Sequence, residues 1–423
     1  MEKYVIEGNK KLKGRVRLSG AKNSALKIMA ATILGNSPSV IEDIPRIKDV
    51  EVMMEVLKTL GVKAEFIDKN IVRIDPSSIS NYNTPYELIR KMRASITILG
   101  PLIAKMGKAR VALPGGCNIG TRPIDLHLKG LSKLGVKISQ ESGCIEATTP
   151  NGLMGNYISM DFPSRGTTEN ILMASVLAKG KTVIENAARE PELVDLANFL
   201  VAMGADIQGI GTDRLIIEGV KELNGIRYRI ITDPIEAGTF LVMAAVTKGE
   251  IFIEGAKPEM IRMAINKFRE CGVNIIEKDN GILVSMDKKP EPTDISTLPF
   301  PGFPTDLQPL ATVLLSLSFG VSIITENIFE NRFTYISELN RMGADIRTDG
   351  HHAVIRGVDK LTGVPVTAPD LRAGAALVTA GLAAEGTTEI YDIYHIDRGY
   401  ENLEDKLTKL GAKISRVKLN NIK

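Results

Sequence analysis

A glycine-rich segment, LPGGCNIGTRPIDLH at residues 113–127, holds the side chains best suited to chemistry. It contains Cys117 and, a few positions later, Arg122. A free thiol has a pKa of about 8.5, and nearby cations or a bound phosphate can tune it toward a proton donor or a thiolate. The residues alone therefore leave two interpretations open, a reactive Cys117 and an ordinary loop cysteine.

The other two cysteines are expected to be structural. Cys271 occupies a position that holds Leu or Met in the matching segments of the chain, so we expect a small core residue. Cys144 starts an expected strand in SGCIEA, where core packing is also expected. Three cysteines without a Cys-x-x-Cys pair fit a reducing compartment, and the four histidines are not spaced as metal ligands. We expect no metal site and no cofactor.

Charged residues recur at one position of a repeated apolar helix, 13 to 15 residues before the glycine that ends it. They are Lys22, Arg93, Arg165, Glu236, Asp306 and Arg372. Helix N-termini attract anions, and the macrodipole disfavours cations there by roughly 0.3–1 kcal/mol. The basic residues therefore need ligand anions or neighbouring carboxylates. The alternative is that all six simply cap helix starts.

A second set of basic residues lies in loops at comparable positions of the repeat. The set comprises Arg46, Lys48, Arg122 beside Cys117, Arg189, Lys257, Arg332 and Arg398. Guanidinium groups bind phosphate and carboxylate groups bidentately, so the two sets together predict a substrate with several anionic groups.

The elements that must position these residues belong to a sixfold repeat of about 70 residues. Phrases such as LGVKAEF and MGADIQG recur, with glycines at 61, 135, 204, 272, 343 and 411. Each phrase follows an amphipathic run and precedes alternating apolar residues, so the glycine should follow a helix and lead into a strand. A second helix in each repeat is apolar almost all round, as expected of a buried helix. Three repeats would form one globular domain and six would form two.

Composition excludes some classes of protein. With 423 residues the chain exceeds the usual size of a single core, and its net charge is only +3. A protein held to nucleic acid by its phosphates would carry a basic excess. The first residues, MEKYVIEGNKKLKG, do not resemble a signal peptide, and no stretch reaches the roughly 18 apolar residues of a membrane span. We expect a cytoplasmic protein that does not insert into a membrane or bind nucleic acid.

Long motifs over nearly the whole chain resemble the UDP-N-acetylglucosamine 1-carboxyvinyltransferase family. They are SGAKNSAL (19–26), MRASI (92–96), LPGGCNIGTRPIDLH (113–127), GTTEN (166–170), IENAAREPE (184–192), FPTDLQ (303–308), FENRF (329–333) and IYHIDRGYENLEDKL (393–407). The resemblance implies an α/β protein with the enolpyruvyl transferase fold, an inside-out α/β barrel. It implies two domains, 22–229 and 1–21 with 230–423, each of three βαβαββ units around buried helices, with substrates in the cleft between them.

The resemblance also implies the reaction. The enolpyruvyl group of phosphoenolpyruvate would move to the 3′-hydroxyl of UDP-N-acetylglucosamine with release of phosphate, the first committed step of peptidoglycan biosynthesis. Cys117 would protonate C3 of phosphoenolpyruvate, form a covalent adduct with it and be the target of fosfomycin. Asp306 would be the base for the sugar hydroxyl.

Further residues are implied as ligands. Lys22, Arg122 and Arg398 would contact phosphoenolpyruvate, with Asn23 beside them, and Lys22 and Arg398 would also serve catalysis. The other substrate contacts would be Arg93, Pro123, Ile124, Asp125, Leu126, Asp306, Ile328, Arg332, Arg372 and Lys48. Phe162, Pro163, Ser164 and Arg165 are a further group, in which Arg165 stands where the family pattern leads us to expect an apolar residue.

Three alternatives remain. Asp306 could be only a helix cap in FPTDLQ. The related shikimate enzyme also uses phosphoenolpyruvate and would share the sixfold architecture, although the cysteine loop and RPIDLH favour the sugar nucleotide. A repeat-built clamp around nucleic acid would instead spread Lys and Arg around a ring.

Overall fold

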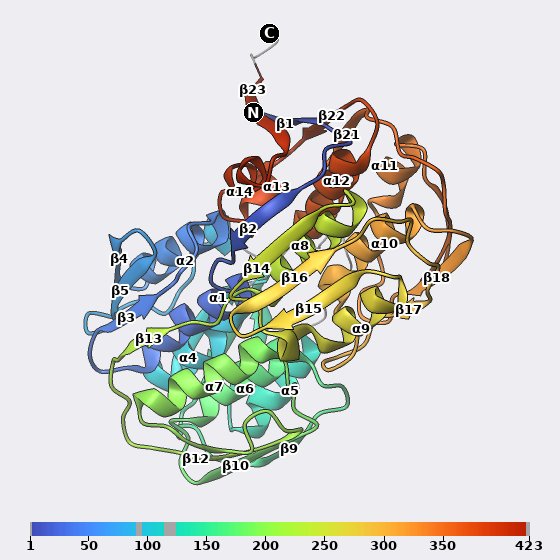
Figure 1. Ribbon diagram of the computed structural model, residues 1–423. Coiled ribbons are helices and arrows are strands. Elements are labelled where there is room, and N and C mark those ends of the chain that lie inside the picture. Colours follow the sequence, from blue (N-terminus) through green and yellow to red (C-terminus); the bar gives the residue numbers. More distant parts are fainter. Residues whose placement is uncertain (1, 90–94, 114–123, 420–423) are drawn as a thin grey trace. The chain divides into compact units, whose positions relative to one another are not determined.

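The computed structural model describes residues 2–89, 95–113 and 124–419, which divide into two compact units (Figure 1). The middle unit is formed by the described residues of 20–231. The split unit is formed by two stretches of chain, 2–19 and 232–419. Each unit has its own hydrophobic core, so each is described separately.

The middle unit contains three helical repeats and their sheets. Its helices are α1 (Lys22–Ala31), α2 (Lys48–Thr59), α3 (Tyr86–Ile89), α4 (Leu99–Met106), α5 (Asp125–Lys133), α6 (Arg165–Ser175) and α7 (Pro191–Met203), with 3₁₀ turns η1 (Thr32–Leu34) and η2 (Ser95–Ile98). Its strands are β3 (Ser39–Glu42), β4 (Lys63–Asp68), β5 (Ile71–Asp75), β6 (Lys108–Ala112), β7 (Lys137–Glu141), β8 (Cys144–Thr148), β9 (Tyr157–Ser159), β10 (Lys181–Glu185), β11 (Asp206–Gln208), β12 (Arg214–Glu218) and β13 (Arg227–Arg229). The sheet orders are β13-β3-β5-β4, β6-β8-β7 and β11-β12-β10-β9.

The split unit repeats the same pattern. Its helices are α8 (Pro234–Val246), α9 (Arg262–Glu270), α10 (Gln308–Ser316), α11 (Ile336–Arg341), α12 (Leu371–Ala383), α13 (Tyr394–Asp397) and α14 (Leu403–Lys409), with η3 (Pro258–Ile261) and η4 (Thr305–Leu307). Its strands are β1 (Glu2–Glu7), β2 (Lys13–Arg17), β14 (Glu250–Glu254), β15 (Asn274–Lys278), β16 (Gly281–Ser285), β17 (Ile295–Ser296), β18 (Val321–Thr325), β19 (Asp345–Asp349), β20 (His352–Arg356), β21 (Pro365–Thr367), β22 (Thr387–Tyr391) and β23 (Lys413–Lys418). The sheet orders are β15-β16-β14-β2, β17-β18-β20-β19 and β21-β22-β1-β23.

The all-round apolar helices are buried, as the sequence predicts. Every residue of α8 is buried, and α8 packs against α10 and α12 in the core of the split unit. A helix that is apolar on all faces is stable only where sheets and other helices cover it completely. The outer helices α9, α11 and α14 are amphipathic instead and bury one face.

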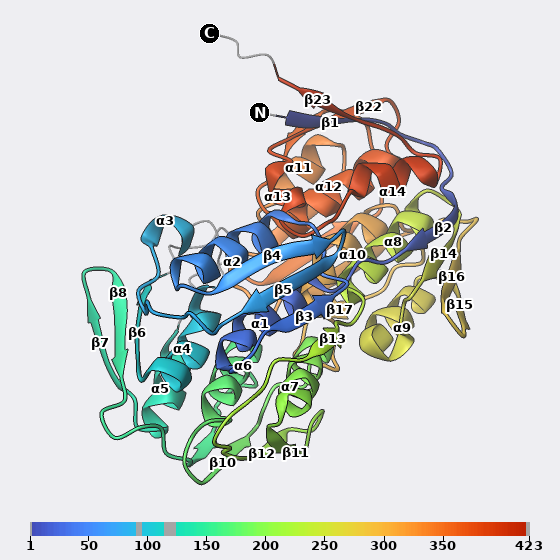
Figure 2. The same cartoon turned by 90° about the vertical axis from the view of Figure 1, so that its left-hand side faces the viewer.

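Strands distant in sequence complete several sheets. β1 pairs antiparallel with both β22 and β23, so a strand from the start of the numbering lies inside the last sheet (Figures 1 and 2). β2 pairs parallel with β14 in the split unit, and β13 pairs parallel with β3 in the middle unit. The chain therefore passes from one unit to the other at 19–20 and again at 231–232.

The six repeat glycines all adopt the left-handed conformation. Their φ values are 90° at Gly61, 90° at Gly135, 113° at Gly204, 85° at Gly272, 94° at Gly343 and 92° at Gly411. Each ends a helix and turns the chain into a strand, because only glycine adopts this conformation without steric cost. The prediction that these glycines follow helices is confirmed.

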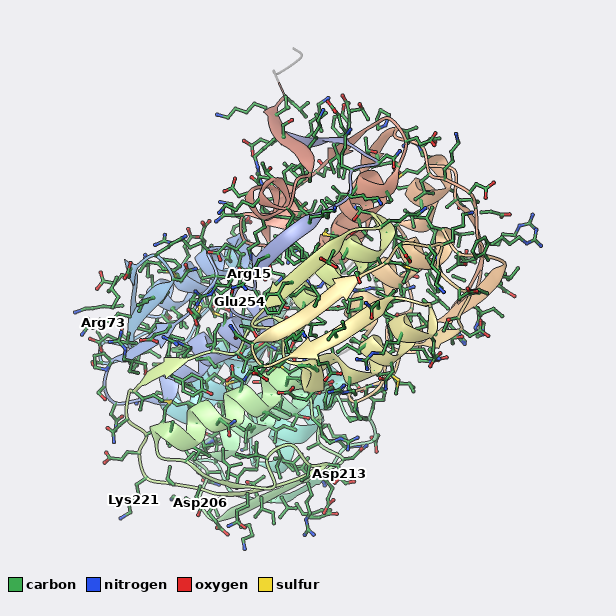
Figure 3. The ribbon with its side chains drawn as sticks, in the orientation of Figure 1. Arg15, Arg73, Asp206, Asp213, Lys221 and Glu254 are labelled. Atoms are coloured by element: carbon green, nitrogen blue, oxygen red, sulfur yellow. The ribbon has the colours of Figure 1, made fainter. Side chains whose placement is uncertain are left out.

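Charged side chains lie on the surface of both units. Arg15 of β2 and Glu254 of β14 lie side by side with an N–O distance of 3.7 Å, and Asp206 and Lys221 point outward from the middle unit (Figure 3). Cys271 is fully buried, as expected. Cys144 is only half-buried, so the expectation of core packing was wrong: it faces away from buried Ile145 on β8. Over the described ranges, no helix is long and apolar enough to cross a bilayer.

Candidate active site

Lys22 begins α1 in the middle unit, and its ammonium group is almost buried. The side chain is 10% exposed, and Nζ lies 2.7 Å from Oδ2 of Asp49 in the first turn of α2, which is 4% exposed. The N-cap residue of α1 makes no side-chain cap hydrogen bond, and the first turn holds no acidic residue. The cation that the macrodipole disfavours is therefore balanced by a carboxylate from a neighbouring helix.

Asn23 and Arg165 meet at one carboxylate. Nδ2 of Asn23 donates to Oε1 of Glu192 at 3.4 Å, and Nη1 of Arg165 lies 3.5 Å from the same oxygen. The starts of α1, α6 and α7 therefore converge within the middle unit. Ser164 caps α6 by accepting a hydrogen bond from the Thr167 backbone N–H.

A buried ion pair joins α1 and α6, one turn beyond the helix starts described above. Lys27 of α1 pairs with Glu169 of α6, and the Glu169 side chain has no exposed area. His127 of α5 is also buried, and its Nδ1 lies 3.0 Å from Nδ2 of Asn170. Burial, and to a lesser extent the charge on Lys27, lower the pKa of His127 to about 4, so the imidazole is neutral at physiological pH.

Asp306 of the split unit lies between two buried guanidinium groups. Its Oδ1 is 3.0 Å from Nη2 of Arg332, and its Oδ2 is 3.0 Å from Nη2 of Arg372. The Asp306 side chain is 24% exposed, whereas those of Arg332 and Arg372 are 3% and 6% exposed. Burial opposes the charged form of Arg372, but Asp306, Tyr400 and Asp233 together outweigh it and raise the pKa of this guanidinium. One carboxylate is thus held firmly while part of it faces solvent.

The helix-cap alternative for Asp306 does not fit this geometry. Asp306 lies within η4, and neither η4 nor α10 has a side-chain cap hydrogen bond. Its carboxylate is directed at Arg332 and Arg372 instead.

Arg398 follows α13 directly and is buried, with 7% of its surface exposed. Two residues later, the Tyr400 hydroxyl lies 2.8 Å from Oγ1 of Thr239 and 3.4 Å from Nη1 of Arg372. The segment that carries Arg398 is therefore tied to α8 and α12, and through Arg372 to Asp306.

Other expected residues lie apart from these contacts. The exposed Lys48 pairs with Glu51 in its own helix at 2.9 Å. Asp125 is exposed at the start of α5, with Ile124 and Leu126 beside it partly buried. In the group before α6, Phe162 is exposed and Pro163 partly buried. The backbone N–H of Ile328 donates to Oε1 of Glu326 at 2.9 Å. Arg93, Cys117, Arg122 and Pro123 lie outside the described residues.

Comparison with known proteins matches these features to a family. The family model described as EPSP synthase (3-phosphoshikimate 1-carboxyvinyltransferase) matches residues 6–407. UDP-N-acetylglucosamine 1-carboxyvinyltransferase 2 of Carboxydothermus hydrogenoformans is 54% identical over 419 residues, covering 99% of this chain and all of the relative. The enzyme of the same name from Halothermothrix orenii is 51% identical over 418 residues, covering 99% of this chain and 100% of the relative.

The chain belongs to the UDP-N-acetylglucosamine 1-carboxyvinyltransferase family.

Solved structures support the fold of this family. The enolpyruvyl transferase NikO from Streptomyces tendae is similar with a TM-score of 0.88 at 24% identity, covering 98% of each chain. EPSP synthase from Acinetobacter baumannii is similar with a TM-score of 0.76 at 17% identity, covering 99% of this chain and 100% of that one. The α/β enolpyruvyl transferase fold expected from the sequence is therefore confirmed.

Several partners of the site residues in this family member were not predicted. Asp49, Glu192 and Glu169 supply the carboxylates that balance Lys22, Arg165 and Lys27. The apolar runs contained one usable signal, because Lys27 and Glu169 are charged residues inside otherwise apolar helices. Among the residues that the structure describes, no cluster of three or more potential metal-binding side chains is found.

Proposed function

We propose that this protein transfers the enolpyruvyl group of phosphoenolpyruvate to the 3′-hydroxyl of UDP-N-acetylglucosamine and releases phosphate. In the cell, this would be the first committed step of peptidoglycan synthesis, in the cytoplasm. The observation that carries the proposal is the Asp306 carboxylate, held by two buried arginines yet partly open to solvent. Full-length identity of about half to enzymes of this name supports the choice of nucleotide sugar.

The reaction needs a proton at C3 of phosphoenolpyruvate, attack of the sugar hydroxyl at C2, and departure of phosphate. Asp306 accepts the hydroxyl proton as the new C2–O bond forms. Loss of a proton from C3 and of phosphate from C2 then restores the double bond in the product. Because Asp306 is held from both sides, the acceptor oxygen needs little reorganisation during the reaction.

The anionic groups of phosphoenolpyruvate require cations in a dry environment. Lys22 and Arg398 are buried basic residues of this kind, and Arg122 is proposed to join them. Charge–charge attraction is stronger where water is excluded, so these residues would bind the phosphate and carboxylate and stabilise the leaving group. The other proposed substrate contacts are Asn23, Arg93, Pro123, Asp125, Ile328, Arg332 and Arg372.

Cys117 is proposed to deliver the proton to C3, and fosfomycin tests this assignment. The reagent should alkylate Cys117 and spare both other cysteines. Cys271 is a buried control, because burial raises the pKa of its thiol to about 11, whereas Cys144 is a partly exposed control. Peptide mass mapping decides the matter: label on either control, or inactivation of Cys117→Asp, would contradict the assignment.

Phosphate release is the direct test of the function. Phosphoenolpyruvate with UDP-N-acetylglucosamine should release phosphate, and either substrate alone should not. Shikimate 3-phosphate in place of the nucleotide sugar tests the related reaction. Phosphate release with shikimate 3-phosphate but not with UDP-N-acetylglucosamine would overturn the proposal. Calorimetric titration with UDP-N-acetylglucosamine should show specific binding, which a nucleic-acid clamp would lack.

A further inference from the structure

Glu326 is a buried carboxylate just after β18, with 3% of its surface exposed. It accepts four hydrogen bonds. Oε1 accepts from Oγ1 of Thr297 at 2.9 Å and from the backbone N–H groups of Ile328 and Phe329 at 2.9 and 3.2 Å. Oε2 accepts from Oγ1 of Thr305 at 2.9 Å. Among the described residues, these partners include no cation.

Three of the four contacts join the two segments that hold the Asp306 cluster, and the fourth connects Glu326 to Thr297, directly after β17. Thr305 immediately precedes Asp306 in η4. In the second segment, the Phe329 ring packs against Arg332, and the guanidinium carbon of Arg332 is 5.6 Å from the centre of that ring. Asn327 reinforces the connection, because its backbone N–H donates to Oγ1 of Thr297 at 2.9 Å. Glu326 therefore fixes where η4 sits relative to the segment that supplies Arg332.

This support matters because η4 is too short to orient Asp306 by itself. It is a single 3₁₀ turn of three residues without a side-chain cap. It leads directly into α10 as the first turn of a longer helical segment, and 3₁₀ turns have poorer hydrogen-bond geometry than α-helical ones. A carboxylate buried without a cation is costly, so its four hydrogen bonds are needed to hold it in place and tie the surrounding segments together.

We propose that Glu326 is a positioning residue for catalysis, which holds Asp306 in the orientation that accepts the sugar hydroxyl proton. It acts through Thr305 on one side and through the Ile328–Arg332 segment on the other. The inference rests on the proposed role of Asp306 as the base. It predicts a loss of turnover rather than of substrate binding, because small displacements of a catalytic group can cost about 100-fold in rate.

Thr305→Val is the sharpest test, because it removes only the hydrogen bond from η4 to Glu326 and keeps the shape of the side chain. We expect kcat to fall about 10- to 100-fold, with KM for UDP-N-acetylglucosamine changed less than about twofold. The melting temperature should fall by only a few degrees, because the buried Oε2 of Glu326 loses its hydrogen bond from Thr305. Thr325→Val is the matched control, since Oγ1 of Thr325 instead contacts Nδ1 of His352 at 3.0 Å, and its kcat should stay at the wild-type value.

Two variants at Glu326 itself extend the test. Glu326→Gln can keep all four contacts if its amide nitrogen faces the Thr305 hydroxyl, which can accept as well as donate. It should therefore recover most of the kcat that Glu326→Ala loses. If Glu326→Ala does not fold, the comparison of Thr305→Val with Thr325→Val still decides.

The result that would overturn the proposal is a wild-type kcat in Thr305→Val, or an equal loss in Thr325→Val. Asp306→Asn, measured in the same assay, separates this failure from failure of the proposed base. An inactive Asp306→Asn with a normal Thr305→Val would refute only the positioning role. A fully active Asp306→Asn would refute the base and, with it, this inference.

Discussion

The helix starts of the two units differ in charge on the same backbone plan. In the middle unit, Lys22 and Arg165 stand at the first positions of α1 and α6, and carboxylates from other helices balance them. In the split unit, Glu236 and Asp306 stand in the first turns of α8 and η4, whereas the third helix start, that of α12, carries Arg372, which pairs with Asp306. Lys406 of α14 lies 2.6 Å from Glu236 in the same way that Arg332 approaches Asp306.

This difference in charge helps to distinguish helix-start residues that stabilise the fold from those that could bind a substrate. Acidic residues at helix N-termini are favoured by the macrodipole, so Glu236 needs no functional explanation. Lys22 is disfavoured at its position and needs the buried Asp49 to balance it. The cationic starts of the middle unit are therefore the stronger evidence for bound anions, and Asp306 is exceptional for its two arginines rather than for its charge.

The largest loss of turnover is expected at Asp306, the proposed proton acceptor of the split unit. Asp306→Asn keeps the shape of the side chain but cannot accept the hydroxyl proton, so turnover should fall about 10²- to 10⁴-fold. Binding of UDP-N-acetylglucosamine, followed by calorimetry, should persist. Near-normal turnover would reduce Asp306 to a structural partner of Arg332 and Arg372.

Variants of Lys22 and Asp49 test the role of a cationic helix start in the middle unit. Lys22→Met removes the cation next to a buried carboxylate, which should cost about 3–5 kcal/mol in the free energy of unfolding as well as turnover. Adding Asp49→Asn should restore most of the stability but not the turnover, as shown by denaturant unfolding and phosphate release. Activity in the double variant would mean that Lys22 serves only the fold.

A pH effect is expected from the middle unit through His127. Its pKa is about 4 in the folded protein and about 6.5 when unfolded, so the unfolded state takes up the proton first. Stability should therefore fall as pH drops from about 6.5 toward 4, by up to about 3 kcal/mol. Unfolding of wild type and His127→Gln at several pH values measures this difference. An NMR titration of His127 near pH 6.5 would contradict it.

The smallest effect is expected at Arg165, the position for which the resemblance led us to expect an apolar residue. Its side chain is 32% exposed, and its carboxylate contacts are 3.5 and 3.9 Å long. Arg165→Val should therefore change the free energy of unfolding by no more than about 1 kcal/mol. A large rise in KM for UDP-N-acetylglucosamine would instead make Arg165 a ligand of the nucleotide sugar.

The repeat made much of the fold predictable. Its glycines mark where helices turn into strands, and a charged residue of either sign recurs at each helix start. Both features are local, so one sequence carries enough information for them. The same reasoning placed Asp306 and Arg372 in equivalent positions, and the two side chains in fact contact each other.

The partners of these residues could not be predicted in the same way. Asn23 and Glu192 are 169 residues apart, and only the packing of α1 against α7 brings them together. The role of Glu326 could not be predicted from its neighbours in sequence, because its four donors come from three separate segments. The error at Cys144 has a similar cause: strand alternation does not say which face of a hairpin is covered.

The insertion of β1 between β22 and β23 has a consequence for biosynthesis. Lys3 and Tyr391, which contact each other, are 388 residues apart. At the usual translation rate of about 5–20 residues per second, β1 must wait roughly 20–80 s for its neighbours to leave the ribosome. During that interval the middle unit can already fold, whereas the split unit still lacks its last sheet. An unpaired strand invites association with other chains, so the nascent protein should depend on chaperones most strongly at this late stage of synthesis.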